Sequence, residues 1–173
     1  GAVRVASGHS FSLRPIGEPH QVTAARGDRI LSLDGRPAAE VAPEGEDLFL
    51  AIGSQVRAVD RAGDALVAAG AEDGSTVQFL RRDSAGAQAD LDALLVRLAA
   101  ETAGKPPAFG LYFNCAARGR DLHGAEDVDV ALIRARFPGL PVVGLFGSFE
   151  LASVDGVARM HAYTGVLVLV SQI

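Results

Sequence analysis

The sequence predicts an α+β protein with mostly antiparallel sheets and two substantial helices, from three observations. Short apolar and β-branched runs alternate with glycine, proline and aspartate turns over most of the first half of the chain. The apolar spacing becomes helical between residues 87 and 103. Short apolar runs then return, and the last of them is Val-Leu-Val-Leu-Val at residues 166–170. Many strands with few helices between them indicate the α+β class.

The N-terminal segment predicts strands joined by tight turns. A strand at residues 3–11 is followed by strands at 21–24 and 29–33, which are connected at Arg26-Gly27-Asp28 with the spacing of a hairpin. A proline then suits the first turn of a short helix at residues 38–41.

The next segment predicts an antiparallel meander. Its four strand candidates occupy residues 48–52, 55–60, 65–69 and 76–82, and each is bounded by glycine or aspartate. A turn signal about every ten residues is typical of consecutive antiparallel strands.

Two segments predict helices. Leucines at positions 91, 94, 95 and 98 recur with helical spacing, so we expect a helix over residues 87–103 that ends at Gly104. A second helix is expected at about residues 126–137, where Pro138-Gly139 ends it.

Three strands complete the prediction. Residues 109–114 and 141–146 are short apolar runs, and residues 160–170 form a longer one. The last run is apolar on both faces, which is typical of a central strand. We expect a single domain over residues 1–173, which begins with Gly1-Ala2 like a fragment or a truncated relative of a longer protein.

Composition limits the partners that we expect. The net charge is −5, aromatic residues make up 6% and tryptophan is absent, so we expect neither nucleic acid nor a membrane surface as partner. The single cysteine, Cys115, permits no intrachain disulfide and fits a reducing, cytoplasmic compartment. No histidine has a second one four residues on and no cysteine pair exists, so we expect no metal and no cofactor.

Polar residues follow the predicted strand at 109–114. Asn114, Cys115, Arg118 and Gly119 lie where the chain leaves the sheet, which is a frequent position for ligands. The guanidinium of Arg118 suits bidentate binding of a carboxylate or phosphate. The alternative is an exposed arginine, or one that closes a structural ion pair.

Further candidates lie near the C-terminus. Glu150 is the only charged residue between positions 142 and 151, and a buried carboxylate there needs a protein arginine or a ligand amine as partner. His161, Tyr163 and Thr164 open the last predicted strand, where His161 and Tyr163 would share one face and line a pocket. Their strand-forming tendency alone is the alternative explanation.

A cysteine hydrolase or transferase is a further hypothesis. Cys115 would be the nucleophile, His123 the base, and Asp121 or Asp127 the orienting carboxylate. Cys115 as a small buried residue is the simpler explanation. The sequence shows no motif of a known cysteine hydrolase, so we expect no enzyme.

Six motifs occur in an order that resembles the FIST family, sensory proteins named for F-box and intracellular signal transduction proteins. The motifs are Arg14-Pro15-Ile16-Gly17, Leu33-Asp34-Gly35-Arg36-Pro37-Ala38, Gly74-Ser75-Thr76-Val77-Gln78-Phe79, Asn114-Cys115-Ala116-Ala117-Arg118-Gly119, Pro141-Val142-Val143-Gly144-Leu145-Phe146-Gly147-Ser148-Phe149-Glu150-Leu151 and His161-Ala162-Tyr163-Thr164-Gly165-Val166-Leu167. The chain is similar mainly to the C-terminal FIST domain, and residues 1–40 resemble the tail of the N-terminal FIST region.

This resemblance implies a cytoplasmic sensory domain of bacterial signal transduction that binds a small ligand, with a free amino acid as candidate. The family's domains are often joined to output modules such as kinases or chemoreceptors, so a signalling output domain or protein is an expected partner. Catalysis is not an attribute of the family.

The resemblance also carries functional positions onto this chain. The family pattern Cys-x-x-Arg-Gly matches Cys115, Arg118 and Gly119. The acidic residue of the pattern Gly-Glu-Ile matches Glu150, and the pattern His-x-x-Thr matches His161 and Thr164. Phe149 replaces a usual glycine, and its ring would fill or reshape a pocket.

The leading hypothesis is therefore a sensory domain for a free amino acid. Arg118 would bind the ligand's carboxylate and Glu150 its ammonium, since both buried charges would then be neutralised. Asn114, His161 or Tyr163 would supply hydrogen bonds. Two alternatives remain, a protein interaction module without a ligand and the Cys115-dependent hydrolase or transferase.

Overall fold

The computed structural model describes residues 1–45, 47–53, 55–154 and 157–172. It confirms the α+β class with mostly antiparallel sheets. The sequence predicts one domain, whereas the residues of the structure group into two compact units. Unit 1 is Gly1–Ser12 with Asp83–Ile173, and unit 2 is Leu13–Arg82. Neither boundary carries a proline or glycine, so composition does not mark them.

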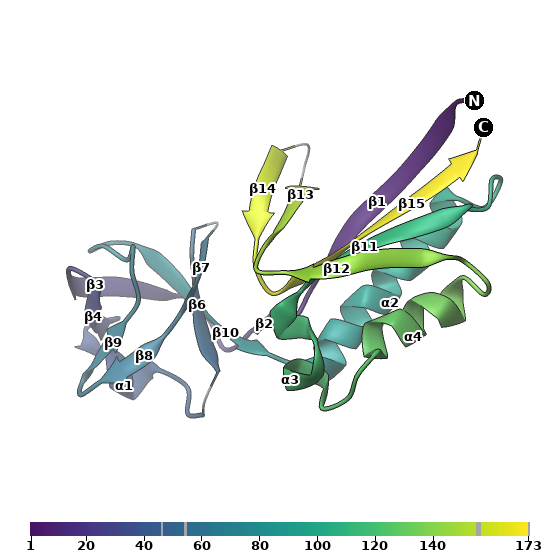
Figure 1. Cartoon of the computed structure of the whole chain (residues 1–173). Coiled ribbons are helices and arrows are strands. Elements are labelled where there is room, and N and C mark those ends of the chain that lie inside the picture. Colours follow the sequence, from purple (N-terminus) through teal and green to yellow (C-terminus); the bar gives the residue numbers. More distant parts are fainter. Residues whose placement is uncertain (46, 54, 155–156, 173) are drawn as a thin grey trace. The chain divides into compact units, whose positions relative to one another are not determined.

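Unit 1 contains a four-stranded sheet (Figure 1). Its strands, in spatial order, are β1 (Val3–Phe11), β15 (Thr164–Gln172), β11 (Phe109–Cys115) and β12 (Val142–Gly147). β15 is antiparallel to both of its neighbours, and β11 is parallel to β12. The prediction of a central terminal strand is confirmed, because β15 lies between β1 and β11.

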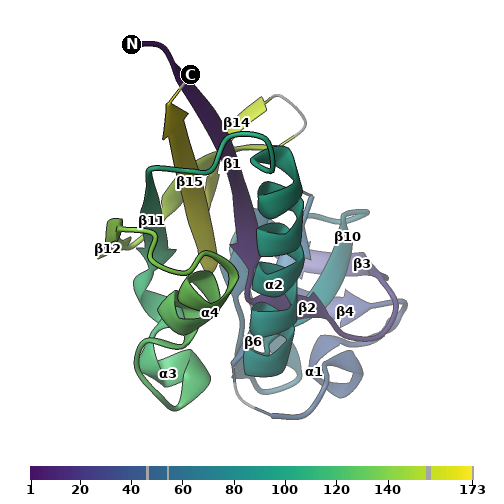
Figure 2. The same cartoon turned by 90° about the vertical axis from the view of Figure 1, so that its right-hand side faces the viewer.

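Two helices, α2 (Ser84–Glu101) and α4 (Val128–Arg136), lie on one face of this sheet (Figure 2). The side chain of Asp83 caps α2 by accepting a hydrogen bond from the backbone N–H of Ala85, at 3.1 Å. Side chains of both helices and of the sheet form one buried cluster of Ala6, Leu91, Leu94, Leu95, Leu98, Tyr112, Ile133, Leu167 and Leu169. Burial of this apolar surface holds unit 1 together.

Short elements complete unit 1. A 3₁₀ turn, η1 (Ala116–Arg118), and a short helix, α3 (Arg120–His123), connect β11 to α4. A hairpin of β13 (Glu150–Val154) and β14 (Val157–His161) lies on the side of the sheet opposite the helices (Figure 1).

The sheet of unit 1 also has an apolar face that the helices do not cover. Because Tyr112 and Leu167 point toward the helices, the alternate residues of each strand point away from them. We call six of these the open face, and their exposed fractions lie between 40% and 66%: Val3, Val5, Phe11, Phe109, Val143 and Leu145.

Unit 2 is built from strands and one short helix, α1 (Ala38–Val41). Its strands are β2 (Leu13–Pro15), β3 (His20–Arg26), β4 (Arg29–Leu33), β5 (Arg36–Pro37), β6 (Leu48–Ile52), β7 (Gln55–Ala58), β8 (Asp60–Ala62), β9 (Ala65–Val67) and β10 (Thr76–Arg82). Their order is β7-β6-β10-β3-β4-β9-β8, with β2 paired to β10 and β5 to β4. The buried core includes Ile30, Leu33, Leu50, Leu66, Val77 and Phe79.

The predicted meander is only partly right: the predicted strand at residues 55–60 is divided into β7 and β8, which lie at opposite ends of the strand order, and the last strand does not continue the meander. β6 pairs with β7 and β8 with β9, as consecutive strands. β10 instead lies between β6 and β3, where Val77, Phe79 and Leu80 are buried. Long-range burial, rather than sequence adjacency, decides its partners.

The predicted strand at residues 160–170 is divided in two. Met160 and His161 pair with β13 in the hairpin, and β15 begins only at Thr164. Between them Tyr163 adopts a left-handed backbone conformation with φ of 61°. This conformation redirects the chain from the hairpin into the sheet.

Among the described residues, no helix has both the length and the apolar character needed to span a bilayer.

Candidate functional site

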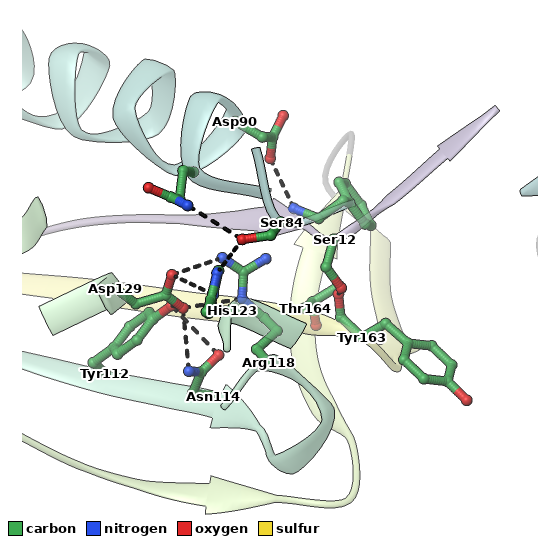
Figure 3. Close-up of polar contacts among 12 residues, drawn as sticks. Ser12, Ser84, Asp90, Tyr112, Asn114, Arg118, His123, Asp129, Tyr163 and Thr164 are labelled. Carbon is green, nitrogen blue, oxygen red and sulfur yellow. Dashed lines mark hydrogen bonds and ion pairs between the residues drawn. The ribbon is translucent and has the colours of Figure 1, made fainter. Parts of the chain in front are cut away.

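A buried polar cluster lies at the end of β11, centred on Asp129 (Figure 3). The carboxylate of Asp129 accepts hydrogen bonds from Tyr112 Oη at 2.7 Å and Asn114 Nδ2 at 3.2 Å. It also binds the guanidinium of Arg118, whose Nε lies 3.1 Å from Oδ2 and whose Nη2 lies 3.3 Å from Oδ1. Arg118 therefore forms a buried structural ion pair with Asp129, which was the alternative to ligand binding.

Three elements bring this cluster together. Tyr112 and Asn114 are two residues apart on β11, so both point toward the helices. Gly165, opposite Asn114 on β15, leaves space for the Tyr112 ring, because an added Cβ would lie 2.9 Å and 3.0 Å from two ring carbons. The η1 turn and the first turn of α4 then supply Arg118 and Asp129.

His123 connects the cluster to the start of α2. Its Nδ1 lies 2.9 Å from Ser84 Oγ, which also accepts a hydrogen bond from Gln88 Nε2 at 3.2 Å. Its Nε2 lies 3.3 Å from Asp129 Oδ1 but lacks hydrogen-bond geometry to any described residue. Burial lowers the pKa of His123 and outweighs the opposing effect of the Asp129 charge. The imidazole is thus held in its neutral form.

Tyr112 and Arg118 have shifted pKa values as well. Burial, followed by the negative charge of Asp129, raises the pKa of Tyr112 well above its ordinary value. Burial alone would lower the pKa of Arg118, but Tyr112 and Asp129 beside it raise the pKa above its ordinary value. Arg118 therefore stays charged, Tyr112 stays protonated, and Asp129 compensates the guanidinium.

A pocket of about 190 Å³ lies beside this cluster. Polar groups of Arg118, Asn114 and His123 line it, together with Gly119 and apolar side chains of β12 such as Val142 and Phe146. The Nη1 atom of Arg118 is buried and has no hydrogen-bond partner in the part of the chain that the structure describes.

Glu150 occupies a second site, on the side of the sheet away from the helices. Its side chain is 4% exposed, and Oε2 accepts a hydrogen bond from Thr164 Oγ1 at 2.7 Å. Its Oε1 is buried and has no hydrogen-bond partner among the described residues. Burial raises the pKa of Glu150, although the Thr164 bonds and the charge of Arg118 counteract the shift.

A second pocket, of about 300 Å³, lies beside Glu150. Apart from this carboxylate its lining is apolar or glycine: Phe113, Leu145, Gly147, Phe149 and Leu151. Phe149 is 54% exposed and forms part of the pocket wall.

His161 and Tyr163 lie near this second site in the chain. His161 is directly opposite Glu150 in the hairpin, and its ring stacks on that of His9 with centroids 5.6 Å apart. Burial, then the neighbouring His161, lowers the pKa of His9. Tyr163 acts through its backbone carbonyl, which accepts hydrogen bonds from Ser12 N at 3.0 Å and Ser12 Oγ at 2.6 Å.

The predicted site residues thus fall into two groups. Asn114, Arg118 and Gly119 line the first pocket, whereas Glu150 lines the second and binds Thr164. Cys115 is 4% exposed and pairs in register with Gly147. Their roles in ligand binding stay predictions.

Sequence reasoning missed several members of the polar cluster. Asp129, Tyr112 and Ser84 were not identified, and His123 was considered only as a partner of Cys115. Asp129 follows Glu126 and Asp127 closely in the sequence, so it does not stand out as Glu150 does in its apolar stretch. Its burial became apparent only from the structure. Asp121 and Asp127, considered as orienting carboxylates, are both exposed.

Comparison with known proteins adds the family context. The model of the FIST C domain matches residues 37–153. A Mycobacterium tuberculosis protein described as uncharacterized is 37% identical over 201 residues, which cover 96% of this chain and 52% of that protein. An uncharacterized Mycobacterium bovis protein is 32% identical over 192 residues, covering 92% of this chain and 49% of its own length. The chain therefore spans about half the length of these relatives.

Proposed function

The chain belongs to the FIST family of signal-transduction sensory domains, and from this premise we propose that it binds a small ligand, with a free amino acid as candidate. One observation carries the proposal. Two buried side chains of opposite charge, Arg118 and Glu150, each keep a polar atom without a partner among the described residues. Such atoms are costly in a protein interior, and a polar ligand would satisfy them.

The two charges contribute differently. Arg118 is neutralised by Asp129, so it offers a ligand one N–H donor at Nη1 rather than an uncompensated charge. Glu150 has a hydroxyl partner, Thr164, but no ion pair with a described cation. The geometry therefore supports recognition of a ligand's ammonium group by Glu150 more strongly than recognition of its carboxylate by Arg118.

We propose sensing without catalysis, in a cytoplasmic location. Buried Cys115 and the contacts of His123 with Ser84 and Asp129 do not favour the cysteine-hydrolase hypothesis. A single free cysteine is compatible with a reducing compartment. A signalling output domain or protein is the partner that we propose.

A thermal-shift screen of the chain against the common amino acids tests this proposal. A ligand that binds only the folded state stabilises it by about 2.7 kcal/mol at a hundredfold excess over Kd. We expect a selective upward shift that Glu150→Gln abolishes and Arg118→Lys weakens. Shifts that persist in Glu150→Gln, or no shift with any amino acid, would contradict it.

The open face favours a second candidate function, a protein interaction module without a small ligand. Exposed apolar residues on one sheet face are typical of docking surfaces. Its test is the binding of a signalling partner that Val143→Asp or Leu145→Asp abolishes while Glu150→Gln leaves it intact.

A further inference from the structure

We propose that the pocket beside Glu150 is a site for hydrophobic amines, in which the Glu150 carboxylate binds a protonated amino group and the apolar wall binds the body of the molecule. The inference rests on the proposed sensory function and deepens it. It names the chemical group that is recognised and makes a ligand carboxylate unnecessary.

Within the described part of the chain, the Glu150 carboxylate has one satisfied oxygen and one unpartnered oxygen. Thr164 Oγ1 satisfies Oε2, whereas Oε1 is buried without a partner among residues that the structure describes. The charge of Arg118 acts on Glu150 only from a distance, without an ion pair, and a buried carboxylate oxygen without a hydrogen-bond donor is unfavourable because its loss of hydration is not recovered. An ammonium group placed against Oε1 would supply both the charge and the hydrogen bond.

The unpartnered oxygen of Glu150 lies close to a glycine of the pocket lining. Gly147 lines the pocket, and a Cβ added at this position would lie 3.8 Å from Glu150 Oε1. The unpartnered carboxylate oxygen is therefore buried close to the wall of this pocket.

The wall of the pocket is mainly aromatic and aliphatic. Phe113, Phe149 and Leu151 provide two aromatic rings and an alkyl side chain around a single carboxylate. Aromatic faces attract cations, and apolar pockets with one polar group select ligands of matching polarity. At about 300 Å³ the pocket is large enough for an arylalkylamine.

A ligand carboxylate would find no cationic partner among the described residues of this pocket. The lining of this pocket contains no arginine or lysine among its described residues. Arg118 lines the other pocket and is held by Asp129 through two hydrogen bonds. A zwitterionic amino acid would thus gain little from its carboxylate here.

Calorimetric titration of the whole chain at pH 7 with three matched probes tests the inference. The probes are phenethylamine, its uncharged analogue 2-phenylethanol, and L-phenylalanine. We expect phenethylamine to bind with a Kd on the order of 0.1–1 mM, as a small ligand of moderate efficiency does. It should bind about tenfold more tightly than 2-phenylethanol and at least as tightly as L-phenylalanine.

Substitutions in the pocket test whether phenethylamine binds beside Glu150. Glu150→Gln should weaken phenethylamine about tenfold and leave 2-phenylethanol unchanged, whereas Glu101→Gln, an exposed carboxylate on α2, should change neither. Leu151 is 70% exposed, so charges placed there do not disturb the fold. We expect Leu151→Lys to weaken phenethylamine severalfold and Leu151→Glu to strengthen it.

The outcomes separate this inference from the proposed function. Binding of L-phenylalanine without phenethylamine would overturn the amine site but leave an amino acid sensor. Failure of phenethylamine to bind, or equal binding by wild type, Glu150→Gln and Leu151→Lys, would overturn the inference. Loss of every response in the amino acid screen as well would overturn both.

Discussion

Asp129 binds the Arg118 guanidinium through both carboxylate oxygens, at 3.1 Å from Nε and 3.3 Å from Nη2. Both side chains are buried, so this pair fixes the end of β11 against α4. The pairing assigns different roles to the two charges that the sequence singled out. Arg118 is part of the structure of unit 1, and Glu150 is left with a carboxylate oxygen for a ligand.

The first prediction concerns the stability of this pair. Asp129→Asn leaves a buried guanidinium without a counter-charge and should destabilise unit 1 by about 3–5 kcal/mol. Asp92→Asn is the matched control, because Asp92 forms an exposed ion pair with Arg136 at 3.0 Å and should cost below about 1 kcal/mol. Urea unfolding followed by tyrosine fluorescence measures both, since both tyrosines belong to unit 1 and the chain lacks tryptophan. Equal effects of the two variants would contradict the prediction.

The second prediction concerns pH. The pKa of His123 is lowered in the fold from an ordinary value of 6.5, so the unfolded chain binds the proton more readily. Above pH 6.5 His123 is neutral in both states, and the free energy of unfolding is not reduced by its titration. As pH falls from 6.5 toward the lowered pKa, the unfolded chain takes up the proton first, so the free energy of unfolding decreases. His9 has the same direction of shift. His123→Gln should therefore flatten part of the acid decline in the unfolding free energy, and His9→Gln another part. Identical pH profiles for all three proteins would argue against it.

The third prediction concerns the space above Gly165. An added methyl group would collide with the Tyr112 ring and displace its hydroxyl from Asp129. Gly165→Ala should destabilise unit 1 by about 1–3 kcal/mol. Gly104→Ala meets no atom within 4 Å and should stay within about 0.5 kcal/mol of wild type. The same fluorescence measurement compares them, and a neutral Gly165→Ala would refute the packing described here.

The fourth prediction concerns Cys115. It is the one cysteine of the sequence and is 4% exposed, so a thiol reagent reaches it only when unit 1 opens. Its reaction with Ellman's reagent should be at least about a hundredfold slower in the native protein than in urea. Fast reaction of the native thiol would revive the cysteine-hydrolase hypothesis.

Local periodicity predicts much of unit 1. The leucines of α2 identify a helix because their spacing selects one buried face, and the apolar run of β15 identifies a central strand because it is apolar on both faces. The turn at Tyr163 was not predictable in this way. It depends on the pairing of Met160 and His161 with β13, a contact that the spacing of apolar residues does not encode.

The same limit applies to the candidate site. Sequence context identified Arg118 and Glu150 as charges in unusual surroundings, and both are buried. It did not identify Asp129 as the partner of Arg118, because the two residues lie on different elements and meet only when α4 packs on the sheet. The position of β10 in unit 2 was missed for a similar reason.

The proposed role of Glu150 is to bind the ammonium group of a ligand with its buried carboxylate. The most direct test follows the Glu150 side-chain carboxyl carbon by ¹³C NMR during a pH titration, with and without saturating phenethylamine. We predict a pKa above the ordinary 4.5 in the free protein, because burial raises it. We predict a downward shift when the amine binds, because a positive charge favours the ionised carboxylate. An ordinary pKa that the amine leaves unchanged would contradict the account.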